Sequence, residues 1–310
     1  MQSLNELSAH YLSVSTRIRN QKTRDHYDRS IRQFGDFLGR AATGGDLTDD
    51  SLCGFMLWTV AQGHAEATAN QRAKQLRALW EWAARRRMVE TFPTFRKLVE
   101  PEPDPVAWRH DQLGALFASC ACQAGWIGPH RAATWWGGLH WWLYDSGERA
   151  AATFALRREW IDLESGTVRV PGRVRKGGRK AMIYRLRNRT RELFAEMLRP
   201  PSDSGLLFDR PWKDDQTFYG RYRKVVTGAG LPWVKRKTGL QKMRITVFTA
   251  IEAGGGDATK FARHSSRAVT ESYIDQAIIA ACGKGQWPRE DITPNQPPTL
   301  WQRLFPRRSA

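Results

Sequence analysis

A proline-rich segment, "VEPEPDPVAW" at residues 99–108, divides the chain into two stretches of different character. Its three prolines alternate with acidic residues, so the segment cannot form a helix. Such a segment is typical of a stiff linker between domains, and 310 residues are enough for about two domains. We therefore expect an N-terminal domain over residues 1–98, a linker over 99–107, a second domain over 108–285 and a proline-rich tail over 286–310.

The stretch before the linker has the periodicity of helices. Apolar residues at helical spacing predict a first helix that starts from an N-cap at Thr23 and ends before the "TGG" at 43–45. A second helix, "DLTDDSLCGFMLWTVAQG", closes near Gly63, and a third, "TANQRAKQLRALWEWAARRR", starts from an N-cap at Thr68. The apolar side of the third helix consists of Leu76, Leu79, Trp80 and Ala83.

Three cations lie on the other faces of that third helix: Arg72, Lys74 and Arg77. They fit either a solvated surface or a face that lies against phosphates. The whole chain favours the second interpretation, because 49 Lys and Arg against 31 Asp and Glu leave a net charge of +18. The segment "PGRVRKGGRKAMIYRLRNR", residues 171–189, contains no acid at all. Such an excess favours a polyanionic partner, most simply nucleic acid.

The stretch after the linker mixes helices with a few strands. "RHDQLGALFASCA" and "HRAATWWGGLHWWLYDSG" have helical patterns, whereas "TVRVPG" and "KAMIYRL" predict two strands joined by the basic turn around "RKGGRK". Further helices are expected in "NRTRELFAEML", "DQTFYGRYRKVVTGAG", "KMRITVFTAIEAGGG", "ATKFAR" and "AVTESYIDQAIIAAC". The expected fold class is therefore mainly α with a small β-sheet (α+β).

Composition also bears on compartment and metal content. No apolar run reaches the ~18–20 residues that span a bilayer, and the first residues lack a secretion signal, so we expect a cytoplasmic, nucleoid-associated protein without membrane contact. The cysteines, Cys53, Cys120, Cys122 and Cys282, form no paired CxxC groups and are expected to be reduced. Cys120 and Cys122 with His130 could be imagined as metal ligands, but no fourth ligand is apparent, so we expect no metal.

The segment "RHSSRAVTESYID" at 263–275 places His264 nine residues before Tyr273. A tyrosine can attack a phosphodiester and store the energy of the bond as a phosphotyrosine. The pentavalent phosphorane carries extra negative charge, which arginine holds best, and the leaving 5′-oxygen needs a proton donor such as lysine. Such a site needs two arginines, a lysine and a histidine near the tyrosine.

From about residue 8 to 282 the chain resembles the tyrosine recombinases, or phage-type integrases. The resemblance rests on "WWLYDSGERAAATFALRREWIDLESGTVRV", "KGGRK" in the hairpin, "LQKMRITVFTA" and "ARHSSRAVTESYID". The helical segment "TANQRAKQLRALWEWAARRRMVETFP" is similar to the family's core-binding domain. Each piece alone has an ordinary explanation, such as a surface arginine or a buried tyrosine. The ordered set of arginine, hairpin lysine, arginine, histidine and tyrosine is much more specific.

The resemblance implies a role for each motif residue. Tyr273 is the expected nucleophile, and Lys176 is the expected proton donor, although the hairpin leaves Lys180 as an alternative. The residues expected to stabilise the transition state are Arg149, Arg244, His264 and, as a neutral helper, Gln241. The residues expected to contact DNA are Arg72, Lys74, Arg77, Arg173, Arg175, Arg179, Lys180 and Lys242.

Three positions depart from the family's pattern. Gln241 stands where a histidine usually precedes the second arginine, and a glutamine amide can donate a hydrogen bond but cannot be charged. Ala152 stands where an acidic residue commonly follows the first arginine, and Arg263 replaces the usual glycine before His264. These changes indicate a divergent member and leave open whether catalysis is reduced or lost.

The resemblance also implies an architecture and a reaction. A helical core-binding (SAM-like) domain and a catalytic domain would form a C-shaped clamp on double-stranded DNA. Strands would be exchanged through a 3′-phosphotyrosyl intermediate and a Holliday junction, without a cofactor, by a tetramer on two DNA sites. The apolar "QAIIAACG" after Tyr273 suits docking on a neighbour. Two alternatives are a monomeric type IB topoisomerase-like enzyme and a non-catalytic DNA-binding relative. The DNA site, accessory DNA-bending proteins and the biological task stay open.

Overall fold

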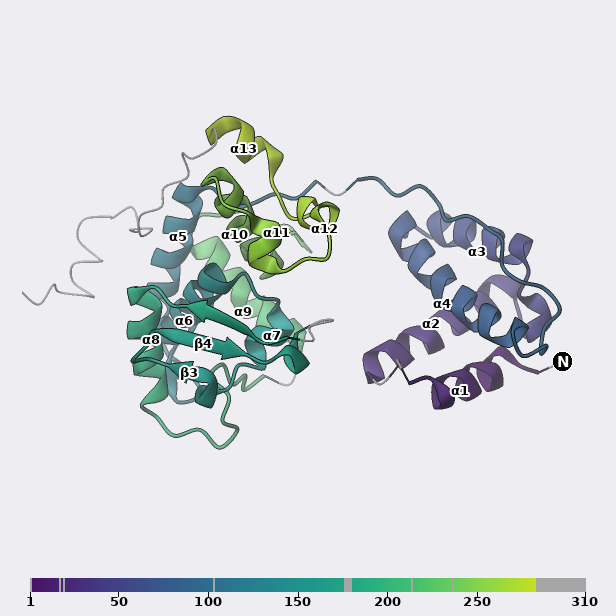
Figure 1. Ribbon diagram of the computed structural model, residues 1–310, viewed down its shortest axis with the longest axis horizontal. Helices are drawn as coiled ribbons and strands as arrows, with labels where there is room; N and C mark the ends of the chain where they lie inside the picture. The colour runs from purple at the N-terminus through teal and green to yellow at the C-terminus, as the bar shows by residue number, and fades with distance from the viewer. Residues whose placement is uncertain are drawn as a thin grey trace, which may run out of the picture. The chain divides into compact units, whose positions relative to one another are not determined.

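The computed structural model forms two compact units, Met1–Glu102 and Pro103–Ala310 (Figure 1). It describes residues 2–16, 18, 20–102, 104–175, 180–212, 214–235 and 237–282. The boundary between the units falls inside the segment for which the sequence predicts a linker. The predicted tail over 286–310 lies outside the described residues.

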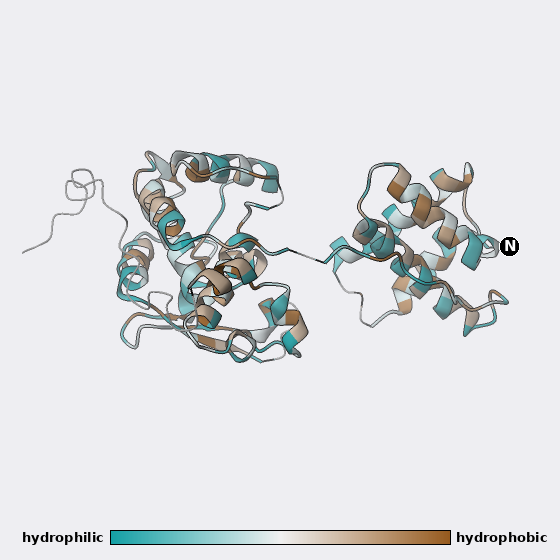
Figure 2. Cartoon of the chain, turned by 90° about the horizontal axis from the view of Figure 1, so that it is seen from above, coloured by the Kyte–Doolittle hydropathy of each residue, from teal (hydrophilic) through white to brown (hydrophobic). Residues whose placement is uncertain are grey.

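The first unit is helical in its described part. Its α-helices are α1 (Leu4–Val14), α2 (Gln21–Leu38), α3 (Asp49–Ala61) and α4 (Glu66–Ala84). The predicted apolar side of α4 is confirmed, since Leu76, Leu79, Trp80 and Ala83 are all buried. They pack with Phe34 of α2 and with the residues of α3 in one core. Figure 2 shows how hydrophobic and hydrophilic residues alternate along these helices.

The starts of two helices differ from the sequence-based expectation. Helix α2 begins at Gln21, because the extended Asn20 accepts a hydrogen bond from the amide of Lys22 at 2.8 Å, so Thr23 is not the N-cap. Helix α4 begins at Glu66 after Ala65, which provides no side-chain cap, so Thr68 lies within the first turn. Both predicted N-caps lie three residues after the observed ones. Helix ends are the part of a helix that is hardest to assign exactly.

The second unit is built around α6 (Ala132–Ser146), which packs against α5 (His110–Ala121), α8 (Asn188–Leu198) and α10 (Gln241–Ala253). Nearly every residue of α6 is buried, as expected for a helix that is apolar on all sides. The other helices of four or more residues are α7 (Ala150–Phe154), α9 (Asp215–Gly228), α11 (Ala258–Ala262), α12 (Arg267–Glu271) and α13 (Gln276–Cys282).

A three-stranded antiparallel sheet completes the second unit. Its order is β3 (Ile161–Asp162), β4 (Thr167–Val170) and β5 (Met182–Arg185), with β4 in the middle (Figure 1). Strands β4 and β5 confirm the predicted pair, and the short turn η3 (Gly172–Val174) follows β4. Two-residue strands β1 (Trp126–Ile127) and β2 (His130–Arg131) form a second small pair before α6.

The last predicted helix is broken in the structure. "AVTESYIDQAIIAAC" does not form one helix but separates into α12 and α13, and Tyr273 lies in the turn between them. The amide of Tyr273 donates to the carbonyl of Thr270 at 2.8 Å, while the amide of Asp275 donates to the hydroxyl of Thr249 on α10 at 2.9 Å. The second bond is a tertiary contact that helps to fix the turn, and periodicity along the sequence does not show it.

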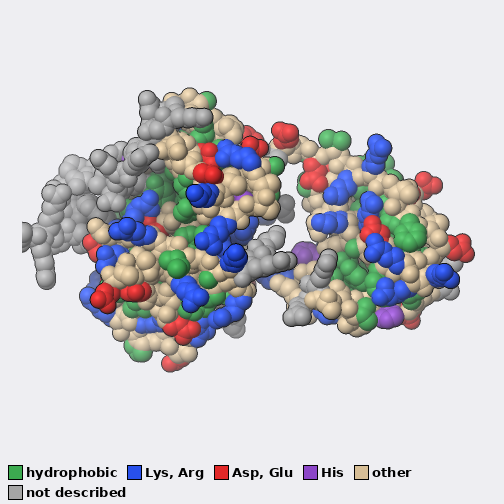
Figure 3. Space-filling model, viewed as in Figure 1, with side chains coloured by type: hydrophobic (Ala, Val, Ile, Leu, Met, Phe, Trp, Pro, Cys, Tyr) green, Lys and Arg blue, Asp and Glu red, His purple; other side chains and the backbone are tan. Residues whose placement is uncertain are grey.

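The fold is thus mainly helical with small antiparallel sheets, as the sequence predicts. Lys and Arg side chains are widely distributed over the faces of both units that Figure 3 shows. Across the described residues, no helix combines the length and apolar character needed to cross a membrane.

Candidate active site

Arg149 occupies the N-cap position of α7, two residues after the left-handed Gly147 that ends α6. Gly147 has φ of 58°, and a Cβ on it would approach the ring of Phe248 to 3.0 Å, so any other residue would be strained there on both counts. The turn directs the half-buried Arg149 towards the C-terminal segment, where its guanidinium donates a hydrogen bond to the hydroxyl of Tyr273 at 3.4 Å.

Arg244 on α10 is the most deeply buried cation of this cluster, with 3% of its surface exposed. Its guanidinium donates to the carbonyl oxygen of Gly147 and to Nε2 of His264, the latter at 2.9 Å. It also lies 4.4 Å from the centre of the Phe248 ring and 5.1 Å from that of Tyr273. Burial and the nearby positive charge of Arg149 lower the pKa of Arg244 to about 10, so it stays protonated at neutral pH.

His264 is held between Arg244 and α12. Because a guanidinium can only donate, Nε2 of His264 must accept from Arg244, and Nδ1 therefore carries the hydrogen and donates to the hydroxyl of Thr270 at 2.9 Å. Burial, followed by the charges of Arg244 and Arg149, lowers the pKa of His264 to about 4. This imidazole is therefore neutral at physiological pH and acts as a hydrogen-bonding group.

Tyr273 lies next to both arginines, and this placement affects its acidity. Burial raises the pKa of its hydroxyl, but the hydrogen bond from Arg149 and the charges of Arg149 and Arg244 lower that pKa by more. A hydrogen bond with the side chain of Gln241, the first residue of α10, acts in the same direction. The net pKa is below the usual value for tyrosine, which is the direction that makes a phenol a better nucleophile.

Five of the residues predicted from the sequence therefore form one cluster, namely Arg149, Gln241, Arg244, His264 and Tyr273. Phe248 lies at its base and was not predicted. Its fully buried ring contacts the guanidinium of Arg244 and packs edge-on against His264 and Tyr273, with ring centroids 5.5 and 5.7 Å apart. Helical spacing could have shown it, because Phe248 follows Arg244 by four residues and so shares its face of α10.

Glu148 is a second residue that the sequence analysis missed. Its side chain is 2% exposed and accepts hydrogen bonds from the guanidinium of Arg175 and, at 2.6 Å, from the hydroxyl of Tyr184 on β5. Ala152 stands at the position where the family pattern has an acid, and it is buried on α7. A carboxylate is thus present beside Arg149, but it precedes that arginine by one position.

Arg263 lies in the left-handed region, with φ of 51° and ψ of 45°, where it ends α11. This conformation accounts for the glycine that the family pattern has at this position, because glycine alone adopts it without a steric cost. The exposed Arg263 side chain donates to the carbonyl oxygen of Ala181, just before β5, at 3.4 Å.

Of the two lysine candidates for the proton donor, only Lys180 lies among the residues that the structure describes. Lys176 lies outside the described residues, as does Arg179 among the predicted DNA contacts, whereas Lys180 is described and exposed. Arg173 is exposed, with its guanidinium 5.6 Å from the ring centre of Trp160. Lys242 lies 4.1 Å from the ring centre of Trp108, and burial lowers the pKa of its ammonium group.

The three cations of α4 are not equivalent, contrary to the expectation that all lie on its open faces. Arg72 is buried, with 8% of its surface exposed, because it lies on the same side of α4 as the core residues Ala69 and Ala73. Arg77 pairs with Glu81 at 2.9 Å, one helical turn further on. Only Lys74 of these three is exposed.

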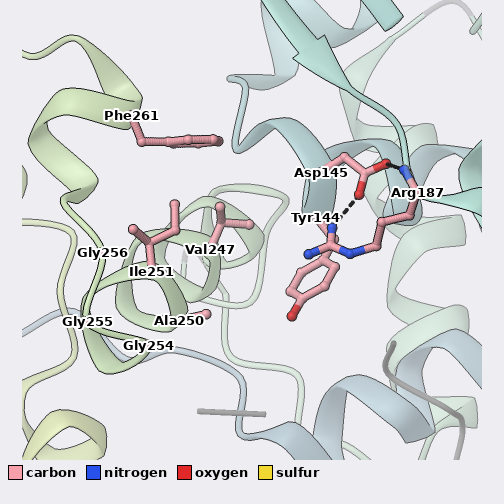
Figure 4. Close-up of a pocket in the computed structure, with 10 residues that line it drawn as sticks. All are labelled: Tyr144, Asp145, Arg187, Val247, Ala250, Ile251, Gly254, Gly255, Gly256 and Phe261. Atoms are coloured by element: carbon pink, nitrogen blue, oxygen red, sulfur yellow. Dashed lines mark hydrogen bonds and ion pairs between the residues drawn. The ribbon is translucent and has the colours of Figure 1, made fainter. Parts of the chain in front are cut away.

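A pocket of about 380 Å³ lies beside this cluster, along a neighbouring face of α10 (Figure 4). At one wall Asp145 binds Arg187, whose guanidinium lies 4.4 Å from the ring centre of Tyr144. Val247, Ile251 and Phe261 line it with apolar surface. None of the predicted catalytic residues that the structure describes lines this pocket, so it is separate from the cluster around Tyr273.

The residues considered for metal binding do not come together in the described part of the chain. No group of three or more His, Cys, Asp and Glu side chains suited to a metal occurs there. Cys120 is instead buried against Nδ1 of His140, at 3.4 Å, and burial raises the pKa of its thiol.

Among solved structures, the fold is similar to that of recombinases and integrases. The Tn1549 transposon integrase in complex with transposon right end DNA superposes with a TM-score of 0.68 at 14% identity, over 90% of this chain and 98% of that one. A lambda integrase dimer bound to a COC′ core site gives 0.67 at 14% identity, over 89% and 96%. The XerH site-specific recombinase, bound to a palindromic difH substrate, gives 0.64 at 14% identity, over 84% and 78%.

These similarities establish the fold, because at such low identity a shared fold does not by itself transfer an activity. No protein-family model matches the sequence, and neither does any curated protein.

Proposed function

We propose that this protein is a site-specific DNA recombinase that cuts and rejoins DNA through a 3′-phosphotyrosyl intermediate. The observation that carries the proposal is the contact between Tyr273 and two arginines, Arg149 and Arg244, on a fold shared with DNA-bound recombinases. A tyrosine in an ordinary apolar core would not have its pKa lowered by two guanidinium groups.

In the proposed reaction, the hydroxyl of Tyr273 loses its proton to solvent and attacks the scissile phosphorus. The bond from the tyrosine oxygen to phosphorus forms while the bond to the 5′-oxygen breaks, and Lys176 or Lys180 protonates that oxygen. Arg149 and Arg244 hold the extra negative charge of the phosphorane. A 5′-hydroxyl from a partner strand then reverses the step, so no external energy source or cofactor enters.

In this proposal His264 contributes as a neutral hydrogen-bonding group and not as a charged group, because its pKa is about 4. Its Nδ1 is engaged with Thr270, and its Nε2 accepts from Arg244. We infer that it orients the Arg244 guanidinium towards the phosphate. Gln241 would donate through its amide from the start of α10, and this amide carries no charge.

The same proposal extends to partners. The proposed partner is double-stranded DNA, which both units would contact. A tetramer would assemble on two DNA sites. Two rounds of strand exchange would then proceed through a Holliday junction. The net charge of +18 supports a DNA partner. Integration, resolution and cassette capture all use this chemistry, and accessory DNA-bending proteins are compatible with it.

The test is covalent trapping on a suicide substrate that is nicked so that religation is blocked. Wild-type protein should form an adduct that resists denaturation, and Tyr273→Phe should form none while binding DNA equally well. An adduct in Tyr273→Phe would refute the role of Tyr273. Tight binding without any adduct from wild type would instead support a non-catalytic DNA-binding protein. Relaxation of supercoiled DNA by a monomer, without strand exchange, would support the topoisomerase-like alternative.

A further inference from the structure

We propose that Thr270 is a positioning residue that couples the placement of the nucleophile Tyr273 to that of Arg244. Thr270 lies on α12 and is fully buried. Its backbone is bonded to Tyr273, and its side chain is bonded to His264, which in turn is bonded to Arg244. This inference rests on the proposed function, because it concerns how the groups that would act on the phosphate are brought together.

The backbone of Thr270 holds the nucleophile. The amide of Tyr273 donates to the carbonyl oxygen of Thr270 at 2.8 Å, and the amide of Ile274 donates to that of Glu271 at 3.1 Å. These two bonds close the end of α12, so the nucleophile is carried on the same turn as Thr270. A displacement of Thr270 would therefore displace Tyr273 with it.

The side chain of Thr270 determines which nitrogen of His264 carries the hydrogen. The hydroxyl lies 2.9 Å from Nδ1, and because a hydroxyl can donate or accept, this contact alone would suit either tautomer. The guanidinium of Arg244 lies 2.9 Å from Nε2 and can only donate, so the hydrogen of the neutral ring is on Nδ1. Thr270 is thus the acceptor that stabilises the tautomer whose Nε2 can bind Arg244.

The surroundings of His264 hold its ring in place for this contact. Its amide donates to the carbonyl oxygen of Thr259 on α11 at 3.1 Å, which fixes the backbone from the other side. Its ring packs against those of Phe248 and Tyr273, with centroids 5.5 and 5.7 Å apart. With the backbone and the ring both held, the Nδ1 hydrogen points at the hydroxyl of Thr270.

One chain of hydrogen bonds therefore runs from the amide of Tyr273 through Thr270 and His264 to Arg244. If α12 were displaced, His264 would lose the acceptor for its Nδ1 hydrogen. That hydrogen could then move to Nε2, where it would face a guanidinium that also donates. Arg244 would lose this partner at the moment when Tyr273 leaves the site. The arginine is thus fully oriented only while the nucleophile is in place, as a positioned catalytic group requires.

The first test reads the tautomer of His264 by NMR of the full chain with 15N-labelled histidine and without DNA. The chain has seven histidines, and loss of a signal in His264→Gln identifies the relevant one. Wild type at neutral pH should carry the hydrogen on Nδ1. Thr270→Val keeps the shape and the backbone carbonyl but removes the hydroxyl, so the hydrogen should shift towards Nε2. Thr270→Ser keeps the hydroxyl and should keep the wild-type tautomer.

The second test measures the rate of adduct formation on the suicide substrate with the same variants. Thr270→Val should slow adduct formation about tenfold, which is the upper range for the loss of one hydrogen bond. Thr270→Ser should stay within about twofold of wild type, because the hydrogen bond is retained. DNA binding should change less than the rate in both variants, since Thr270 is buried and acts through His264.

Thr190→Val is the matched control for the loss of a buried hydroxyl. Thr190 is also fully buried in the second unit, and its hydroxyl donates to Asp145 at 2.6 Å, outside the cluster around Tyr273. The variant therefore removes a comparable bond from the same unit. It should change neither the tautomer of His264 nor the rate of adduct formation.

An unchanged tautomer in Thr270→Val would overturn the inference, because Thr270 would then not determine the position of the hydrogen. Equal slowing by Thr270→Val and Thr270→Ser would overturn it as well, since it would show a general structural role. So would an undiminished rate in Thr270→Val. Failure of the proposed function is a different result, because wild type would then form no adduct while the ring nitrogens of His264 would still report on Thr270.

Discussion

Arg244 is the residue on which the others in this site depend. It is almost fully buried, and its two terminal nitrogens donate to the carbonyl of Gly147 and to His264. A buried guanidinium is costly unless its partners are fixed, so its presence constrains the neighbouring groups. Burial lowers the pKa of His264, and the charges of Arg244 and Arg149 lower it further. The same two charges and the hydrogen bond from Arg149 lower the pKa of Tyr273 against the effect of burial.

The neutral state of His264 can be measured directly by an NMR pH titration. With a pKa of about 4, the imidazole should keep its neutral chemical shifts down to about pH 5, whereas an unperturbed histidine titrates near 6.5. Loss of the signal in His264→Gln identifies it. A midpoint near 6.5 would contradict the burial and charge that we assign to this site.

The same depressed pKa fixes the sign of its effect on folding stability. Between pH 4 and 6.5 the unfolded chain binds a proton at His264 that the folded chain does not, so this group lowers stability as the pH falls through that range. The fully buried His140, whose pKa is also lowered to about 4, acts in the same direction.

Phe248→Leu tests the base of the site. The substitution shrinks a fully buried ring, so the free energy of unfolding should fall by about 1–1.5 kcal/mol. Adduct formation should fall more than DNA binding, because Arg244, His264 and Tyr273 lose their common support. Phe208→Leu, in the core of the same unit but outside these contacts, is the control and should cost similar stability without slowing cleavage. Equal effects of the two variants on cleavage would contradict the role of Phe248.

At the scale of elements, the turn between α12 and α13 decides where the nucleophile lies. The carboxylate of Asp275 stabilises this turn. It accepts hydrogen bonds from the amides of Ala277 and Ile278 in the first turn of α13. It also accepts one from the amide of Ala107. The segment that enters the second unit is thus bonded to the segment that carries Tyr273.

Asp275→Ala should therefore destabilise the second unit more than the loss of a simple helix cap. It removes a cap and leaves the buried amide of Ala107 without this acceptor, at a combined cost of about 2–4 kcal/mol in the free energy of unfolding. Asp214→Ala removes an exposed cap that accepts from the amide of Thr217 and should cost about 1 kcal/mol. Equal costs in denaturant titrations would show that the bond to Ala107 contributes nothing.

The elements also show what the sequence can and cannot predict. The pattern of "NRTRELFAEML" matches α8, Asn188–Leu198, because amphipathic periodicity is a property of the segment itself. The break at Tyr273 depends on bonds to Thr249, which lies on another helix, and no local signal reports it. Motif spacing indicated Arg149 and Arg244, but the contact of Glu148 with Arg175 joins distant segments and so required the fold.

For the whole molecule, charge is the dominant property. A net charge of +18 means that DNA binding should release many counterions and weaken steeply with salt. Raising the salt from 50 to 200 mM should lower affinity at least about a hundredfold. Lys74→Gln, at an exposed cation, should reduce the slope of log affinity against log salt by about one, whereas Arg77→Gln should change it less, since Arg77 already pairs with Glu81. A salt-independent affinity would exclude phosphate contacts as the main source of binding.

The most direct measurement of the central claim is the identity of the residue that carries the DNA. Wild-type protein is trapped on the suicide substrate, the DNA is trimmed with nuclease, and tryptic peptides are weighed by mass spectrometry. The account predicts a nucleotide on the peptide of residues 268–284, in which Tyr273 is the only tyrosine. A nucleotide on any other peptide, or a cleaved substrate without a modified peptide, would contradict it.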